Sequence, residues 1–152
     1  MKLIASLSLA VVTAAVAASA VAQVAFQKPE DAIKYRRGAL TVMSAHYGAL
    51  GAMATGRAPY DAAAAARHGE VIQLVSTLPW SAFTPGTDKG ETRARPEIWQ
   101  EEAKFRQAHE RAIQEVGRIA VAARSGNLDQ LKAAWGPNSG SCKACHDNFR
   151  KD

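Results

Sequence analysis

The stretch from Pro96 to Gly126, PEIWQEEAKFRQAHERAIQEVGRIAVAARSG, sets the fold class of this 152-residue chain. It carries large apolar residues amid charged ones: Trp99, Phe105, Ile113, Val116 and Ile119. A proline at the first helical position and a glycine after the last turn are typical helix boundaries. The stretch therefore predicts one long helix that begins near Pro96 and Glu97 and ends before Gly126.

Two further helices are predicted upstream of this stretch. The first begins near Pro29, where two acidic residues suit the positive end of the helix dipole, and it ends near Gly56. The second follows Asp61, a favourable N-cap residue, and runs to about Thr77. In the first helix, apolar residues recur at helical spacing: Ile33, Leu40, Met43, Tyr47 and Leu50.

Residues 79–95 are predicted to form the longest loop, because prolines and glycines are concentrated there. Long loops in compact domains are often functional. Trp80 and Phe83 are predicted to anchor this loop by burying their rings.

A fourth helix is predicted to begin after Asn127. Pro137 lies within it, and a proline inside a helix removes a hydrogen bond and clashes with the preceding turn. We therefore expect a kink or break there, with the helix resuming through Cys142 to Arg150. Four helices joined by short links and one longer loop predict an all-α, antiparallel, up-down-up-down four-helix bundle over residues 23–152.

The composition supports a single helical domain. Hydrophobic residues make up 47% of the chain and charged residues 22%, which is typical of globular proteins. After the first 24 positions β-branched residues are few, and no run alternates with period two, so a sheet is not expected. The net charge of +5 is spread along the chain, so we predict no nucleic-acid binding, although it favours docking to acidic redox partners.

Residues 1–22 have the anatomy of a secretory signal peptide. A positive start at Lys2 precedes an uncharged apolar stretch, and Ala20-Val21-Ala22 matches a cleavage site. The alternative is a membrane anchor, but the stretch is short for a span of ~20 residues and lacks a basic stop-transfer flank. We predict cleavage after Ala22 and export to the periplasm of a bacterium, without membrane insertion.

Cys142-Lys143-Ala144-Cys145-His146 forms the C-x-x-C-H motif of covalent haem attachment. Two cysteines three positions apart lie on one side of a helical turn, where their sulfurs can form thioethers with the two vinyl groups of the porphyrin. The adjacent histidine is then placed to bind the iron. The motif therefore predicts one haem c per chain, held by Cys142 and Cys145, with His146 as the iron ligand.

Three other interpretations of the motif fit the sequence less well. A zinc site requires about four ligands, and the motif supplies three. A thioredoxin-type dithiol requires a preceding strand and a βαβ setting, which the sequence does not predict. A structural disulfide would leave the following histidine without a role.

The chain resembles the cytochromes c′, which are c-type cytochromes built as four-helix bundles with C-x-x-C-H close to the C-terminus. Five segments carry the likeness: Lys28–Ala32, Tyr35–Leu40, Leu78–Trp80 with Phe83, Arg95–Trp99, and Cys142–Arg150. The resemblance implies a five-coordinate, high-spin iron with His146 as its only protein ligand.

The resemblance also implies roles for residues around the haem. Leu40 matches a leucine that covers the vacant face of the iron. Arg36 matches an arginine near a haem propionate, and Arg37 is a second candidate for that contact. Arg150 lies one helical turn after His146, where a basic residue flanks the imidazole.

Further residues are assigned less directly. Phe83, supported by Trp80, is implied to line the haem pocket, and the region of Glu91 is implied to approach a propionate. His46 and His68 have no partner spacing in the sequence, and we predict that they are surface residues.

An open iron site beside an apolar distal face can bind small neutral gases such as nitric oxide and carbon monoxide, but offers no hydrogen bond to dioxygen. The resemblance implies nitric oxide binding, one-electron transfer with an unidentified periplasmic partner, and a homodimer formed through the first helix. No acid–base pair or nucleophile accompanies the motif, so no catalytic residues and no enzymatic activity are predicted.

One alternative function remains open. Met43 lies three residues after Leu40 on nearly the same helix face, and methionine is a known haem ligand. The protein would then be a dedicated low-spin, six-coordinate electron carrier.

Overall fold

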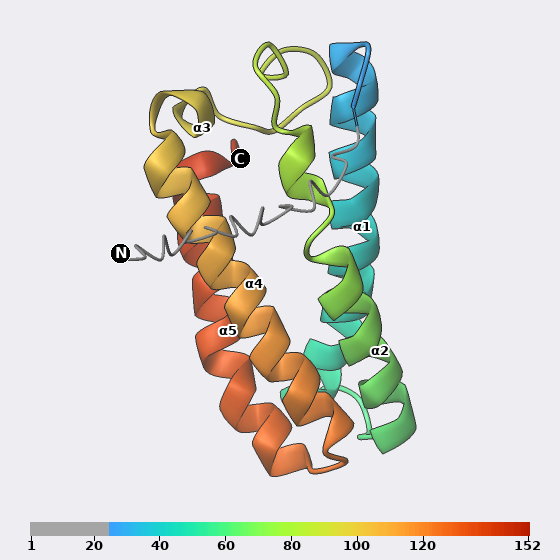
Figure 1. Ribbon diagram of the computed structural model, residues 1–152. Helices are drawn as coiled ribbons and strands as arrows, with labels where there is room; N and C mark the ends of the chain where they lie inside the picture. The colour runs from blue at the N-terminus through green and yellow to red at the C-terminus, as the bar shows by residue number, and fades with distance from the viewer. Residues whose placement is uncertain (1–24) are drawn as a thin grey trace, which may run out of the picture.

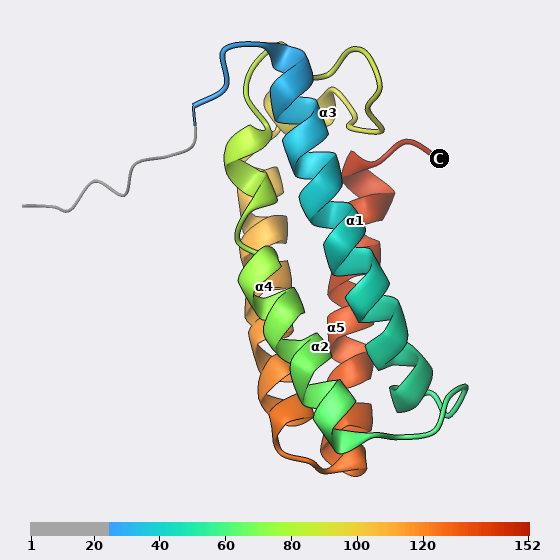
Figure 2. The same cartoon turned by 90° about the vertical axis from the view of Figure 1, so that its right-hand side faces the viewer.

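Four long helices form the bundle in the computed structural model, which describes residues 25–152. They are α1 (Pro29–Ala54), α2 (Ala62–Val75), α4 (Glu102–Arg124) and α5 (Leu128–Phe149). Each runs opposite to the long helix before it, so that α1 and α4 descend while α2 and α5 ascend (Figures 1 and 2). The predicted all-α, up-down-up-down bundle is confirmed, whereas the predicted signal peptide lies outside the described residues.

Local signals at the helix ends explain most of the boundaries. Pro29 occupies the first turn of α1, where its missing N–H has no intrahelical partner to lose. The Asp61 side chain caps α2 by accepting a hydrogen bond from the Ala64 N–H at 2.7 Å. Asn127 caps α5 by accepting from two N–H groups of its first turn, at 2.9 and 3.1 Å. Gly126 before it has φ of 69°, a conformation that favours glycine.

The third predicted helix is interrupted in the structure. A four-residue helix, α3 (Glu97–Gln100), is separated from α4 by Glu101, whose φ and ψ are −120° and 47°. The Trp99 Nε1–H donates to the backbone carbonyls of Phe83 and Thr84, at 3.0 and 3.1 Å, and holds α3 against the loop. The prediction of one continuous helix from Glu97 is therefore wrong at Glu101.

The predicted break at Pro137 is also wrong, because α5 continues through this residue. A proline ring also crowds the N–H and the Cβ of the residue before it, and here that residue is Gly136, which has no Cβ. Pro137 is exposed, as is Ala133, whose carbonyl loses its usual helical partner and can bond to water instead.

The half of the bundle that contains the α1–α2 and α4–α5 connections is filled by one apolar core. We call it the apolar core; its buried members are Leu50, Met53, Ala54, Ala65, Ile72, Val116, Ile119, Ala123 and Leu131. Trp135 of α5 stacks on Tyr47 of α1 with ring centroids 4.5 Å apart. The Trp135 ring also lies against Gly51 so closely that a Cβ there would overlap it, so a glycine is required at this crossing.

The opposite half brings together the start of α1, the short helix η1 (Pro79–Ala82), the loop 83–96 and the end of α5 (Figures 1 and 2). An isolated antiparallel bridge joins Ala94 to Arg150. The Arg95 N–H donates to the Phe149 carbonyl at 3.1 Å, and the Lys151 N–H donates to the Arg93 carbonyl at 2.8 Å. The loop therefore holds the end of the helix that carries the C-x-x-C-H motif.

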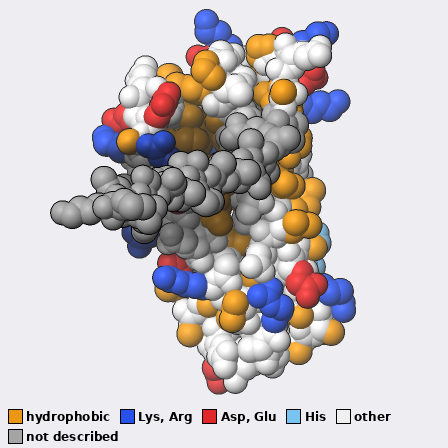
Figure 3. Space-filling model, in the orientation of Figure 1, with side chains coloured by type: hydrophobic (Ala, Val, Ile, Leu, Met, Phe, Trp, Pro, Cys, Tyr) orange, Lys and Arg blue, Asp and Glu red, His pale blue; other side chains and the backbone are white. Residues whose placement is uncertain are grey.

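None of the helices within residues 25–152 combines the length and the hydropathy needed to cross a membrane. Acidic and basic side chains are interspersed over the visible face rather than gathered in one block (Figure 3).

Candidate functional site

The C-x-x-C-H motif lies on the last turns of α5. Cys142 and Cys145 are half-buried, and their sulfurs are not joined in a disulfide. His146 is exposed as a residue, although its imidazole is partly desolvated. Within residues 25–152 no three or more His, Cys, Asp and Glu side chains converge on a point where they could hold a metal ion, which disfavours the zinc interpretation.

The electrostatics of the motif disfavour dithiol chemistry. Burial raises the pKa of Cys142, and it raises the pKa of Cys145 to about 11, with the neighbouring Cys142 adding to the effect. Both groups are therefore protonated at neutral pH, whereas a reactive dithiol needs a thiolate. Partial burial and the nearby Arg150 charge lower the pKa of His146, so its imidazole is neutral, the form that binds metals.

A group of mostly edge-to-face rings, which we call the aromatic cluster, lies beside the motif and includes Trp80, Phe83, Phe105 and Phe149. The Phe105 ring centroid lies 5.0 Å from that of Phe83 and 5.3 Å from that of Phe149. Cys145 packs against this cluster. Trp80 and Phe83 are packed in this cluster, although each is only partly buried. The cluster offers an apolar wall of the kind that a porphyrin edge needs.

Arg36 is the most unusual residue of this half, because it is a cation with only 2% of its surface exposed. Its Nη1 donates to the Ala82 carbonyl at 2.9 Å and to Thr87 Oγ1 at 2.6 Å. Its Nη2 donates to the Thr87 carbonyl at 2.6 Å and to Thr92 Oγ1 at 2.8 Å. The guanidinium carbon also lies 4.5 Å from the Phe83 ring centroid.

All of these partners are neutral, and none of the ion pairs among the described residues involves Arg36. Burial lowers the pKa of Arg36 to about 10, so it remains charged at neutral pH. A buried charge is costly unless an opposite charge accompanies it. The residues present therefore fit a cofactor with an anionic group, and the haem propionates supply such a group.

Arg37, the next residue, is exposed, and unlike Arg36 it has a charged partner. Its Nη1 lies 2.8 Å from Glu91 Oε2 and 2.9 Å from the Glu91 carbonyl oxygen. The pair ties the loop to α1 at the surface. The roles at a propionate predicted for Arg37 and Glu91 stay predictions.

Leu40 lies one helical turn after Arg36 on α1. It is half-buried, and it belongs neither to the apolar core nor to the aromatic cluster that the described residues form. Met43, one turn further, packs against the apolar core. Before Leu40, the inner face of α1 therefore contacts the loop. After Leu40, it packs into the apolar core.

Arg150 follows the last residue of α5, and its N–H donates to the His146 carbonyl at 3.0 Å. Its charge is close enough to lower the pKa of His146. Sequence reasoning missed Thr87 and Thr92, the hydroxyl partners of Arg36. They lie 51 and 56 residues away in sequence, so no local pattern could indicate the contact.

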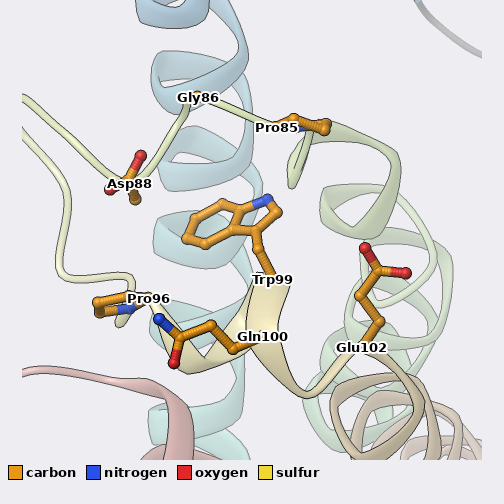
Figure 4. A pocket seen from close by; sticks show the side chains of 7 residues that line it. All are labelled: Pro85, Gly86, Asp88, Pro96, Trp99, Gln100 and Glu102. Carbon is orange, nitrogen blue, oxygen red and sulfur yellow. The ribbon is translucent and has the colours of Figure 1, made fainter.

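Two hollows flank this half of the bundle. One, of about 390 Å³, is lined by Pro85, Gly86, Asp88, Pro96, Trp99, Gln100 and Glu102. Figure 4 shows the Trp99 ring between the loop and α3, with the Asp88 and Glu102 carboxylates on opposite sides of it. The other, of about 610 Å³, lies between α4 and α5 and reaches Cys145.

An antiparallel four-helix bundle with C-x-x-C-H on its last helix, an aromatic wall and a buried arginine beside it defines a class of c-type haem proteins. Comparisons with known proteins agree. Cytochrome c′ from Alcaligenes xylosoxydans xylosoxydans is 48% identical over 126 residues, which cover 83% of this chain and 98% of that protein. The sequence pattern described as Cytochrome C′ matches residues 31–150, and the chain belongs to this family.

Solved structures show the same relationship. Cytochrome c′ from Rubrivivax gelatinosus superposes with a TM-score of 0.80 at 44% identity, covering 84% of this chain and 100% of that one. A nitric oxide complex of a leucine-to-alanine variant of cytochrome c′ from Alcaligenes xylosoxidans superposes with a TM-score of 0.78 at 47% identity, covering 84% of this chain and 99% of that one. The predicted cofactor is confirmed: the protein carries haem c, bound covalently through two thioethers.

Proposed function

We propose that this cytochrome is a periplasmic haem protein that binds small gases, nitric oxide and carbon monoxide, at a five-coordinate high-spin iron. Cys142 and Cys145 hold the haem, and His146 is the only protein ligand of the iron. The observation that carries the proposal is how the side chains of α1 are packed. Leu40 is covered by neither packed cluster, whereas Met43 is already packed in the apolar core.

The surrounding side chains bind and orient the cofactor. Arg36 pairs with a propionate through charge-assisted hydrogen bonds, which gives its buried charge a partner. Phe83 lies against both Arg36 and Phe105, and so lines the pocket on the loop side. Arg150 flanks the imidazole of His146. When bound, the haem supplies an iron that exchanges one electron and can take a neutral diatomic ligand.

The gas-binding part of the proposal rests on the distal side chain. Leu40 offers no hydrogen bond, which disfavours dioxygen more than nitric oxide or carbon monoxide. Relatives support this choice of ligand: the Alcaligenes xylosoxidans protein is known as a nitric oxide complex of a leucine-to-alanine variant and as a ferrous arginine-to-lysine variant with bound nitric oxide.

Cleavage after Ala22 delivers the chain to the periplasm, where it exchanges electrons with an unidentified redox partner and has no catalytic turnover of its own. A homodimer through α1 is supported by the large apolar side chains that α1 and α2 leave exposed, Val42 at 44% and Leu74 at 70%.

A second candidate is the low-spin electron carrier with Met43 as a sixth ligand. The position of Met43, one helical turn from Leu40, favours it. The packing of Met43 against the apolar core counts against it.

Absorption and EPR spectra of the purified ferric protein, followed by reduction and addition of nitric oxide, test the proposal. We expect a high-spin ferric spectrum, a rapid change on adding the gas, and the same ferric spectrum in Met43→Leu. A low-spin spectrum that ignores the gas and becomes high-spin in Met43→Leu would establish the electron carrier instead. A His146→Gly variant that keeps the native ferric spectrum would contradict the assignment of the iron ligand.

A further inference from the structure

His46 and His68 form a pair that links α1 to α2. Their Nδ1 atoms lie 2.9 Å apart, and their ring centroids are 5.0 Å apart with planes at 62°. Both side chains are half-buried. The prediction that they are surface residues holds in part, because both are half-buried. Their contact was not predicted, because they are 22 positions apart in sequence and lie on two helices joined by a connection.

The two imidazoles share one proton between their Nδ1 atoms. In a neutral pair one Nδ1 donates and the other accepts, so one lone pair already points at the space between the rings. Burial, His46 and Arg67 lower the pKa of His68, which keeps this imidazole neutral at pH 7. Neutral imidazole is the commonest protein ligand of transition metals.

The separation of the two nitrogens matches the spacing of two ligands on one metal ion. Imidazole nitrogens bind at about 2.0–2.1 Å. Two such bonds at a right angle, as in the tetragonal geometry of Cu²⁺ and Ni²⁺, place the nitrogens about 2.9 Å apart, and a tetrahedral angle places them about 3.4 Å apart. The observed 2.9 Å therefore matches the nitrogen separation, and a small turn of each ring would direct both lone pairs at an ion beside the line that joins the nitrogens.

We propose that His46 and His68 bind a divalent transition-metal ion that bridges α1 and α2, with Cu²⁺ held most tightly. The donor imidazole moves its proton from Nδ1 to Nε2, so both Nδ1 atoms become ligands and no proton is released. Affinity follows the order Ni²⁺ < Cu²⁺ > Zn²⁺. Water completes the coordination, because the described residues provide no cluster of three metal-binding side chains.

The location of the pair permits this coordination. Both histidines are half-buried, so part of each side chain remains open to solvent. Water can therefore reach the ion, while the two helices fix the ligands. His46 lies on α1 six residues beyond Leu40, and neither histidine is part of the C-x-x-C-H motif, so the site is separate from the proposed gas-binding site.

Titration of the ferric haem-loaded protein with Cu²⁺, followed by calorimetry and EPR, tests this site. We expect one site whose EPR signal shows coupling to two nitrogens, and an increase in Tm as Cu²⁺ is added. In His46→Gln and in His68→Gln we expect about tenfold or greater loss of affinity. His109→Gln removes a histidine that stacks on Trp80 far from the pair in sequence, and it should bind Cu²⁺ like the native protein.

Each variant removes one ligand, so either of them that folds decides the question. Native affinity in the folded variants, or an EPR signal with a single coupled nitrogen, would overturn the proposal. Equal loss in His109→Gln would overturn it as well, since the effect would not be specific to the pair. None of these readouts depends on gas binding at the iron.

Discussion

The interiors of the two halves of the bundle are filled by different kinds of side chain. In the apolar core, Leu50, Ile119 and Leu131 from three helices are completely buried against protein side chains. In the other half, α1 contributes a buried arginine with neutral partners and a leucine that neither cluster covers. The bundle is therefore completed by protein in one half, and it is shaped to receive the haem in the other.

The largest effect is expected from a substitution in the apolar core, which should lower stability without affecting the haem. Leu50→Ala should lower the free energy of unfolding by about 2–5 kcal/mol, because it leaves a cavity among fully buried side chains. The haem spectrum should not change. Urea unfolding of the haem-loaded protein measures the first quantity, and absorption spectroscopy the second. A greater loss of stability in Leu40→Ala than in Leu50→Ala would contradict the division between the halves.

A smaller effect distinguishes two adjacent arginines. Arg36→Ala should cost about 1–3 kcal/mol, because it leaves buried carbonyl and hydroxyl groups unpartnered. Arg37→Ala should cost less than about 1 kcal/mol, since it breaks an exposed ion pair. Removing the Arg36 charge should also lower the reduction potential, because a nearby positive charge favours the ferrous form.

Urea unfolding and a redox titration of both variants measure these effects. Equal losses of stability, or an unchanged potential in Arg36→Ala, would mean that the Arg36 charge does not face the cofactor.

The smallest effect is a dependence of stability on pH. Burial lowers the pKa of His68 and of His109 below the ordinary value of 6.5. The folded state therefore disfavours their charged forms. Their contribution to stability is fully present above pH 6.5 and is lost as the pH falls through the lowered pKa values. The urea midpoint should be lower at pH 5 than at pH 7.

Carboxylates also titrate in this range, so the matched control is the double variant His68→Gln, His109→Gln. Its midpoint should change less between the two pH values than that of the native protein. An identical change in both proteins would assign the dependence to other groups.

Features set by contacts between neighbours in sequence were predictable, whereas features set by contacts between distant residues were not. The starts of α1, α2 and α5 were predictable, because Pro29, Asp61 and Asn127 act on their own helical turns. The motif was predictable because its residues are neighbours in sequence. The break at Glu101 was not predictable, because it depends on Trp99 bonding to a loop 15 and 16 residues away.

The same limit applies to the side-chain partners. The burial of Arg36 depends on two threonines in the loop, and the pairing of His46 with His68 depends on the crossing of α1 and α2. The continuity of α5 at Pro137 depends on neighbouring residues and was therefore predictable in principle. Predicting it requires the effect of the preceding Gly136 to be considered together with that of the proline.

The continuity of α5 has a consequence for hydrogen exchange. Pro137 has no N–H, so the ladder of hydrogen bonds is weakened between the turns that pack in the apolar core and the turns that carry Cys142 to His146. The two segments can therefore open with different free energies. Amides before Pro137 should exchange only with global unfolding, whereas those after it should owe their protection to the bound haem.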